Sequence, residues 1–186
     1  MRKLVEGDEV LLTFQIIGTA PNAAVQKPFL SDFFAGMVVD LHHAVTYTAF
    51  KGAGAFRDGE KIQTSKNSLL EEAIVGLDLN TYKVKEVVPK LTDFIAKTKH
   101  IRHFGANALE LCYVANGLTD AFVDVRGKLR TTDVAAGFLI LKEAGGLVTT
   151  PENKELNVPL DPKQTVSFIA SGNLQIHKKI LSLVKP

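Results

Sequence analysis

The chain has 186 residues, of which 46% are apolar and 23% are charged, a balance typical of one soluble globular domain with a substantial core. The net charge of +2 and the scattered basic residues favour neither a nucleic-acid nor a membrane partner. One cysteine excludes an internal disulfide, no apolar run reaches the roughly 18 residues of a membrane span, and the N-terminus lacks a signal-peptide core, so the sequence predicts a cytoplasmic protein.

The first half of the chain is predicted to consist mostly of strands, because β-branched and apolar runs alternate there with glycine- and proline-containing turns. The expected elements are a buried strand at 10–20, a loop at 21–32, antiparallel strands at 35–41 and 44–49, a hairpin turn at 51–59, strands at 60–64 and 73–79, and a helix at 83–98. Pro89 lies inside that helix, which therefore either kinks or begins there.

The second half alternates strands and helices. The expected elements are a strand at 101–104, a turn at Gly105-Ala106-Asn107 that opens a helix, a strand at 121–125, a helix that starts at Asp133 and stops at Gly145-Gly146, strands at 147–150 and 165–170, and a helix at 173–184. We therefore predict an α+β fold in one domain, residues 1–186, with antiparallel strands and one helix in 1–98 and an α/β arrangement in 99–186.

Several polar residues are expected to have no catalytic role. Cys112 lies on the apolar face of its helix, which favours buried filler over a nucleophile. The five histidines lack the spacing of a metal site and are predicted to be structural or on the surface. The pair Glu71-Glu72 precedes a strand and is predicted to be a solvated turn.

Two interpretations of Asp133 remain open at this level. A carboxylate just before a helix is a favoured N-cap, but it can also ligate a metal or a substrate. The charged residues near Asp133 also have two interpretations. Asp120, Asp124 and Asp133 lie on one predicted strand and the turn after it, with Arg126 and Arg130 between them. That pattern suits a phosphorylated polyol, with arginines on the phosphate and an aspartate on a hydroxyl, or an ordinary cluster of surface salt bridges.

Several separate blocks of the chain resemble one family, in the same order. The C-terminal signature is GANALELCYVANGLTDAFVDVR followed by RTTDVAAGFLILKEAGG, preceded by VTYTAFKGAGAFRDGEKIQTS and followed by SFIASGNLQIHKKI. From Ala35 to the C-terminus, these blocks resemble the inositol monophosphatase and fructose-1,6-bisphosphatase superfamily, most closely its archaeal-like branch. The resemblance implies a layered αβαβα sugar-phosphatase fold, usually dimeric, with Mg2+-dependent phosphomonoesterase activity on a phosphorylated polyol or sugar.

The resemblance also implies roles for particular residues. Asp133 matches an aspartate that ligates the second metal. The turn Gly105-Ala106-Asn107 matches one whose backbone faces the substrate, although Ala106 lacks the hydroxyl usual there. Asp124 matches an acidic residue that accepts a substrate hydroxyl, and Arg102 matches a position that is commonly basic.

The family's first metal site is not found in this sequence. That site needs a Glu-Glu pair and an Asp-Pro-Ile/Leu-Asp-Gly-Thr block. In one alignment Phe14 to Thr19 occupies the place of this block, with Phe14 and Ile17 replacing its aspartates. In the alignment that we favour, Phe14 to Ala20 is the following strand and the block would lie before Met1, as in an N-terminally truncated member of the family.

Both alignments leave one family carboxylate, Asp133, where the family has four. Paired metals activate the attacking water and neutralise the leaving oxygen, so we expect little or no Mg2+-dependent hydrolysis by this chain alone. The alternative is a non-catalytic sugar-phosphate-binding protein, or a subunit that depends on a partner. We also expect exposed apolar surface on the N-terminal side, covered by oligomerisation or by a rearranged N-terminal strand.

Overall fold

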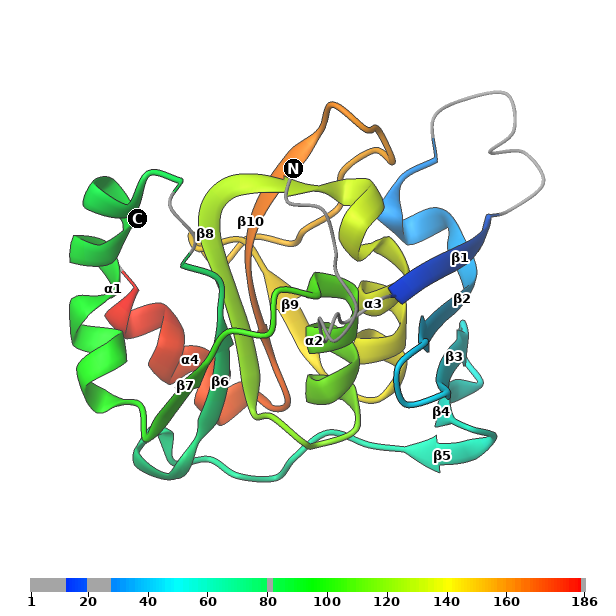
Figure 1. Cartoon of the computed structure of the whole chain (residues 1–186), viewed down its shortest axis with the longest axis horizontal. Helices are drawn as coiled ribbons and strands as arrows, with labels where there is room; N and C mark the ends of the chain where they lie inside the picture. Colours follow the sequence, from blue (N-terminus) through cyan, green and yellow to red (C-terminus); the bar gives the residue numbers. More distant parts are fainter. Residues whose placement is uncertain (1–12, 20–27, 80–81, 185–186) are drawn as a thin grey trace, which may run out of the picture.

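The computed structural model describes residues 13–19, 28–79 and 82–184, which form two five-stranded sheets. The strands of the first sheet are β1 (Thr13–Thr19), β2 (Phe33–Asp40), β3 (Val45–Phe50), β4 (Gly54–Arg57) and β5 (Glu60–Ile62). Those of the second are β6 (Ile74–Leu77), β7 (His100–Arg102), β8 (Ala121–Arg130), β9 (Leu147–Thr149) and β10 (Thr165–Ser171). The first sheet is an antiparallel meander in chain order (Figure 1).

The second sheet is mixed and has the order β7-β6-β8-β10-β9. Its strand β6 runs parallel to both β7 and β8, whereas β10 runs antiparallel to β8 and β9. The α-helices are α1 (Val84–Lys97), α2 (Asn107–Ala115), α3 (Thr131–Glu143) and α4 (Leu174–Leu183), and short 3-10 turns lie at Leu30–Asp32 and Leu70–Glu72.

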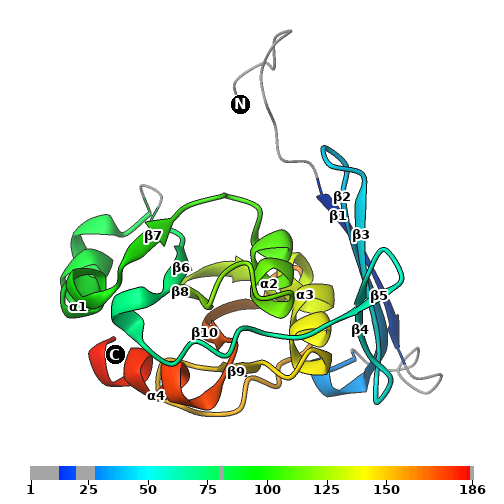
Figure 2. The ribbon, with the colours of Figure 1, turned by 90° about the horizontal axis from the view of Figure 1, so that it is seen from below.

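These elements stack in four layers, which Figure 2 shows edge-on. Helices α1 and α4 cover one face of the second sheet, α2 and α3 lie between the two sheets, and the first sheet closes the stack. The observed order is therefore αβαβ. The fifth, helical layer implied by the family resemblance has no counterpart among the described residues, and the outer face of the first sheet exposes Ile16, Phe34 and Phe50.

The side chains of β8 point alternately to the two faces of the second sheet, so this strand contributes to a hydrophobic core on each face. Phe122 faces the α2–α3 layer, while Ala121 and Val123 face α1 and α4. On the α2–α3 side the rings of Phe122 and Phe138 both pack edge-on against Phe168, with centroids 5.3 and 5.0 Å away. Aromatic packing thus ties β8, β10 and α3 together.

Most of the predicted elements are confirmed, including the helix predicted at 83–98, which runs as α1 from Val84 to Lys97 and does not begin at Pro89. The hairpin turn predicted at 51–59 is wrong in part, because strand β4 occupies Gly54–Arg57 within that range. The first strand is described only over Thr13–Thr19, so residues 10–12 and 20 of that prediction, and 21–27 of the predicted loop, lie outside the described residues. Its predicted burial is wrong at Ile16, which is 56% exposed because its side chain lies on the outer face of the first sheet, which no described element covers.

The end of β8 and the placement of β6 and α1 also differ from the prediction. Strand β8 continues to Arg130 instead of ending at residue 125, because Gly127 adopts a φ of +65° at an irregularity opposite β10 and the ladder resumes beyond it. Strand β6 and helix α1, predicted within the antiparallel half 1–98, instead belong to the second sheet and its outer helix layer. The α/β part of the fold therefore begins near residue 74.

Within the described residues, no helix combines the length and the apolar character that crossing a bilayer requires.

Helices α2 and α3 approach each other closely at Gly137. A Cβ atom added there would lie 2.8 Å from Leu111 Cδ1, 2.9 Å from Leu111 Cβ and 3.1 Å from the carbonyl oxygen of Ala108. Two of these atoms belong to the backbone or lie next to it and cannot rotate away. The absence of a side chain at Gly137 thus places the first turn of α2 directly against α3.

We expect Gly137→Ala to lower the free energy of unfolding by about 1–2 kcal/mol, because overpacking at this contact outweighs the gain of up to about 1 kcal/mol in helix propensity. Chemical denaturation monitored by circular dichroism measures the change. Lys178→Ala on the exposed face of α4 is the control and should change stability by less than about 0.5 kcal/mol. A Gly137→Ala variant as stable as the control would contradict the close contact.

Candidate functional site

A buried ion cluster lies just beyond the carboxyl end of β6, beside the middle of the parallel strand β8. The guanidinium of Arg126 is 2% exposed and binds two carboxylates, that of Asp124 on the same strand and that of Asp78 just after β6. Arg126 Nη2 lies 2.6 Å from Asp124 Oδ2, and Nε lies 3.0 Å from Oδ1. Burial alone disfavours the charged guanidinium, but the hydrogen bond and charge of Asp124 and the charge of Asp78 raise the pKa of Arg126.

The predicted alternation of aspartates and arginines is divided by the fold into three separate groups. Asp124 and Arg126 are buried, so they are not surface salt bridges. Asp120 lies at the opposite end of β8, where its Oδ2 accepts the Ile74 N–H at 2.8 Å and ties the start of β8 to β6. Asp133 is at the start of α3. The cluster also includes Asp78, which the sequence analysis did not single out, although a carboxylate directly after a buried parallel strand is a recognisable signal.

The predicted turn at Gly105-Ala106-Asn107 is confirmed and opens α2. Gly105 is exposed and has a φ of +74°, a conformation that other residues rarely adopt. The N-cap is Ala106, which makes no side-chain cap, so the first N–H groups of α2 have no capping oxygen from this residue. The backbone N–H of Gly105 instead donates to Oε1 of Glu110 at 3.1 Å.

Glu110 is the second buried acid that the sequence analysis missed, because helical spacing does not reveal how deep a polar residue lies. It is 2% exposed. Burial raises the pKa of its carboxyl group to about 7, against the opposing effect of the Gly105 N–H, and the charge of Asp78 adds to the increase. Asp78 is therefore common to the ion cluster and to the environment of Glu110.

Three buried polar atoms in this region have no hydrogen-bond partner among the described residues: Asn107 Oδ1, Glu110 Oε2 and Arg126 Nη1. Buried polar groups are normally paired, and unpaired ones call for an explanation such as water or a ligand. All three belong to the turn, to the helix behind it or to the ion cluster beside it. The polar groups of this region are thus not fully satisfied by the protein itself.

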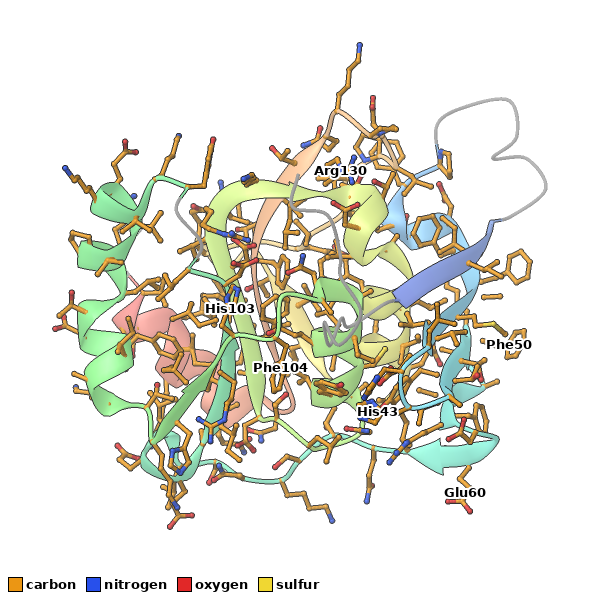
Figure 3. The ribbon with its side chains drawn as sticks, viewed as in Figure 1. His43, Phe50, Glu60, His103, Phe104 and Arg130 are labelled. Atoms are coloured by element: carbon orange, nitrogen blue, oxygen red, sulfur yellow. The ribbon has the colours of Figure 1, made fainter. Side chains whose placement is uncertain are left out.

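Two further side chains lie at the edge of this region. His103 Nδ1 is 3.2 Å from the carbonyl oxygen of Leu77 and 3.5 Å from Asp78 Oδ1, and Figure 3 shows the ring over β6 and β8. Arg102, predicted to contact substrate, is exposed on β7 and its Nη1 donates only locally, to the carbonyl oxygen of Ile101 at 3.1 Å. Its guanidinium therefore remains largely in solvent.

Asp133 is not an N-cap, which corrects one of the two interpretations offered by the sequence. Helix α3 begins at Thr131 and its N-cap is Arg130. Asp133 lies in the first turn and binds Arg130 through both oxygens, with Nε–Oδ2 and Nη2–Oδ1 distances of 3.0 and 2.9 Å. This hydrogen bond and the charge of Asp133 raise the pKa of Arg130. In Figure 3 Arg130 lies well apart from His103.

The residues near Asp133 do not fit a magnesium site. Mg2+ requires several oxygen ligands in octahedral geometry. No group of three or more histidine, cysteine, aspartate or glutamate side chains that could hold a metal ion is found in the part of the chain that the structure describes. Both oxygens of Asp133 are engaged by Arg130, so metal binding there would first require the loss of this ion pair.

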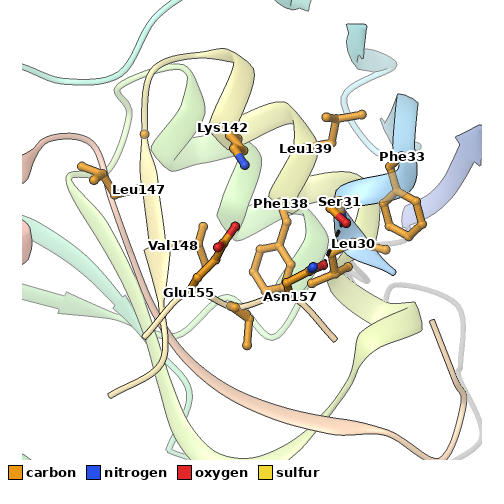
Figure 4. A pocket seen from close by; sticks show the side chains of 13 residues that line it. Leu30, Ser31, Phe33, Phe138, Leu139, Lys142, Leu147, Val148, Glu155 and Asn157 are labelled. Atoms are coloured by element: carbon orange, nitrogen blue, oxygen red, sulfur yellow. Dashed lines mark hydrogen bonds between the residues drawn. The ribbon is translucent and has the colours of Figure 1, made fainter. Parts of the chain in front are cut away.

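An apolar cavity of about 230 Å³ lies on another side of α3 (Figure 4). Its wall is mostly aliphatic and aromatic, and Lys142 and Glu155 both point into it. Ser31 and Asn157 close one side, with the Ser31 N–H donating to Asn157 Oδ1 at 3.1 Å. None of the predicted site residues lines this cavity, so it is separate from the polar region around Glu110.

The remaining candidates have structural roles. Cys112 is fully buried and burial raises the pKa of its thiol, in agreement with its prediction as core filler. His177 is buried between Ser171 Oγ and Thr149 Oγ1, at 2.7 and 3.0 Å, and burial lowers its pKa. The pair Glu71-Glu72 is exposed in a 3-10 turn, as predicted.

Comparison with known proteins agrees with this geometry. Residues 27–186 match the inositol monophosphatase family. The chain is 39% identical over 161 residues to a bifunctional NADP phosphatase/NAD kinase of Methanococcus maripaludis, covering 83% of this chain and 27% of that protein. It is 36% identical over 159 residues to a fructose-1,6-bisphosphatase/inositol-1-monophosphatase of Methanothermobacter thermautotrophicus, covering 85% of this chain and 55% of that one.

Solved structures give the same result. A hypothetical protein of Pyrococcus horikoshii, described as similar to inositol-1 monophosphatase, superposes with a TM-score of 0.71 at 31% identity, over 83% of this chain and 58% of that one. The chain thus spans 55% and 58% of the length of the last two relatives and 27% of the bifunctional one. From the match over most of its length and from the shared layered fold, we conclude that this chain belongs to the inositol monophosphatase family.

Proposed function

We propose that this chain provides the substrate-facing half of a phosphomonoesterase site for a phosphorylated polyol or sugar, and that it hydrolyses such a substrate weakly or not at all by itself. The observation that carries the proposal is the family match combined with the uncapped turn at the start of α2 beside three unpaired buried polar atoms. The names of the relatives point to inositol phosphates, fructose bisphosphate and NADP as candidate substrates.

The chemistry of the substrate half follows from its groups. The N–H groups and dipole of α2 favour a phosphate at the Gly105-Ala106-Asn107 turn. Arg102, exposed on the neighbouring strand, adds a positive charge that attracts the same group. Asp124 is proposed to accept a substrate hydroxyl, as the family resemblance implies, but its oxygens are shared with Arg126 and it reaches substrate only if that pair opens.

Weak hydrolysis is proposed because the described residues do not assemble the ligands of a metal pair. Bound magnesium in such enzymes polarises the phosphoryl group and generates the nucleophile. Asp133, the one described residue that the resemblance makes a metal ligand, is bound to Arg130. We propose Asp133 as a partial ligand that acts only when further carboxylates are supplied.

The alternative is a sugar-phosphate-binding protein, or a subunit of a larger assembly, that performs no hydrolysis. The same lack of clustered metal ligands among the described residues favours this non-catalytic alternative.

We also propose a homodimer formed through the outer face of the first sheet, since exposed large apolar side chains on one sheet face mark an interaction surface. A cytoplasmic location is proposed on the basis of the single, reduced cysteine.

We expect the purified chain with Mg2+ to release phosphate from inositol 1-phosphate or fructose 1,6-bisphosphate at least about a thousand-fold more slowly than a full-length relative, because metal stabilisation of several kcal/mol is lost. A phosphate-release assay measures the rates. The proposal of weak activity would be contradicted by rapid turnover of the unaltered chain that Asp133→Asn abolishes. The exposed control Glu72→Gln should retain that turnover.

The substrate half predicts binding without turnover. Calorimetry should detect inositol 1-phosphate binding, and Arg102→Ala should weaken it about five- to ten-fold, as expected for loss of one charge-assisted contact of about 1 kcal/mol. Lys99→Ala, which removes another exposed positive charge just before β7, is the matched control and should change affinity less than two-fold, on the order of a few tenths of a kcal/mol. Equal effects of the two substitutions would show that Arg102 makes no specific contact.

The proposed dimer predicts a concentration-dependent mass in light scattering after gel filtration. Phe50→Lys should shift the protein toward monomer, because a charge on the outer face of the first sheet opposes burial. Leu118→Lys, at an equally exposed leucine in the loop before β8, is the control and should leave the mass unchanged. A monodisperse monomer for the unaltered chain would refute the dimer.

A further inference from the structure

The apolar cavity beside α3 has the composition of a small-molecule binding site. Its volume is about 230 Å³, and Phe33, Phe138 and Leu139 belong to a wall that is mostly aliphatic and aromatic. A few polar side chains, among them Lys142 and Glu155, interrupt this wall. Cavities that bind small molecules combine an apolar wall with a few polar groups that orient the ligand, and those for drug-sized ligands measure about 300–1,000 Å³. The cavity therefore suits a ligand smaller than a typical drug.

Backbone pairing holds the walls of this cavity in place. The segment before β2 is joined to the loop before β10, because the Leu30 N–H donates to the carbonyl oxygen of Val158 at 3.1 Å. Elsewhere on the wall, β9 pairs with β10, and Thr149 of β9 forms an antiparallel bridge with Glu155. The cavity is thus formed by paired backbone segments before any ligand arrives, which lowers the ordering cost of binding.

The charges of Lys142 and Glu155 are opposite in sign and face each other across the cavity. Figure 4 shows the ammonium group of Lys142, on α3, and the carboxylate of Glu155, in the loop after β9, pointing toward one another. Neither side chain forms an ion pair or a hydrogen bond with another residue in the part of the chain that the structure describes. Both charges are therefore available to a ligand.

This pair of charges selects the kind of ligand. A ligand with a carboxylate alone is attracted by Lys142 and repelled by Glu155, and a ligand with an ammonium group alone meets the reverse. A ligand that has one of each is attracted by both side chains. The apolar wall around Phe138 adds the burial of a hydrocarbon side chain.

We propose that the cavity binds an apolar α-amino acid in its zwitterionic form. The carboxylate of the ligand pairs with Lys142, its ammonium group pairs with Glu155, and its side chain packs against the ring of Phe138. Binding is non-covalent, and no proton moves. None of the residues of the α2 turn or of the ion cluster lines this cavity, so the inference does not depend on the phosphomonoesterase role proposed above.

Leucine is the test ligand, and calorimetry on the unaltered chain measures its affinity. We expect a dissociation constant between about 10 μM and about 1 mM, which is reasonable for a ligand of this size. Isocaproate lacks the ammonium group of leucine and isoamylamine lacks its carboxylate, and each should bind at least about ten-fold more weakly, because one charge-assisted contact is replaced by repulsion. Equal affinities of the three compounds, or no binding of leucine at about 10 mM, would overturn the inference.

Substitution of each charged residue should change the preference of the site in opposite directions. Lys142→Met should weaken leucine binding about three- to ten-fold and strengthen isoamylamine binding, because the repelling charge is removed. Glu155→Gln should weaken leucine binding to a similar extent and strengthen isocaproate binding. A general structural defect would not produce this crossed pattern.

The matched controls are Lys178→Met on α4 and Glu152→Gln in the loop that contains Glu155, since both residues are exposed and neither lines the cavity. Each should change leucine affinity less than about two-fold, as expected for a screened surface charge. Effects of the controls as large as those of Lys142→Met and Glu155→Gln would overturn the inference.

Methyl NMR signals of the unaltered chain locate the bound leucine without any substitution. The signals of Leu139 and Val148, which line the cavity, should shift on titration, and those of Leu118, an exposed leucine before β8, should not. Leucine binding that shifts Leu118 and leaves the cavity signals unchanged would overturn the inference, because the ligand would then lie elsewhere.

Discussion

The shared helix layer between the two sheets is the constraint on which the rest of the structure depends. Helix α3 is buried from Val134 to Leu141, and such a helix is stable only inside a core. It packs against the first sheet on one side, against the second sheet on the other, and against α2 through Gly137. Because α2 and α3 are held this firmly, the turn before α2 and the carboxylate in the first turn of α3 have defined positions.

The buried ion cluster of Asp78, Asp124 and Arg126 also holds the candidate site in place. The Arg126 guanidinium neutralises part of the charge of Asp78 and Asp124, and removal of one partner from such a buried cluster leaves an uncompensated charge that costs about 3–5 kcal/mol. The cluster therefore connects the carboxyl end of β6 to the middle of β8. It also determines the electrostatic environment of Glu110, because Asp78 faces both groups.

Four layers of the family's layered fold are present among the described residues, and the outer face of the fourth is exposed. The described residues reproduce the second sheet, its outer helices and the central helix layer, in agreement with a match that covers most of this chain but only 58% of a solved relative. Along the first sheet, the inward side chains Val38, Tyr47 and Ala49 are buried against the helix layer, whereas the outward Phe50 meets solvent. The proposed homodimer rests on these exposed apolar side chains of the outer sheet face.

The sequence by itself determined the family, the order of nearly all the elements, the turn at Gly105-Ala106-Asn107 and the burial of Cys112, because these depend on local spacing and on residue types that recur in fixed blocks. Only the tertiary structure showed that Asp124 and Arg126 are buried with Asp78, that Asp133 pairs with Arg130 inside the first turn of α3, and that Glu110 lies under the turn. Local spacing does not encode these relations. Asp78 and Arg126 are 48 residues apart in the chain and become partners only because β6 and β8 pair in parallel, and Glu110 is buried only because Gly76 on β6 leaves space for its carboxyl group.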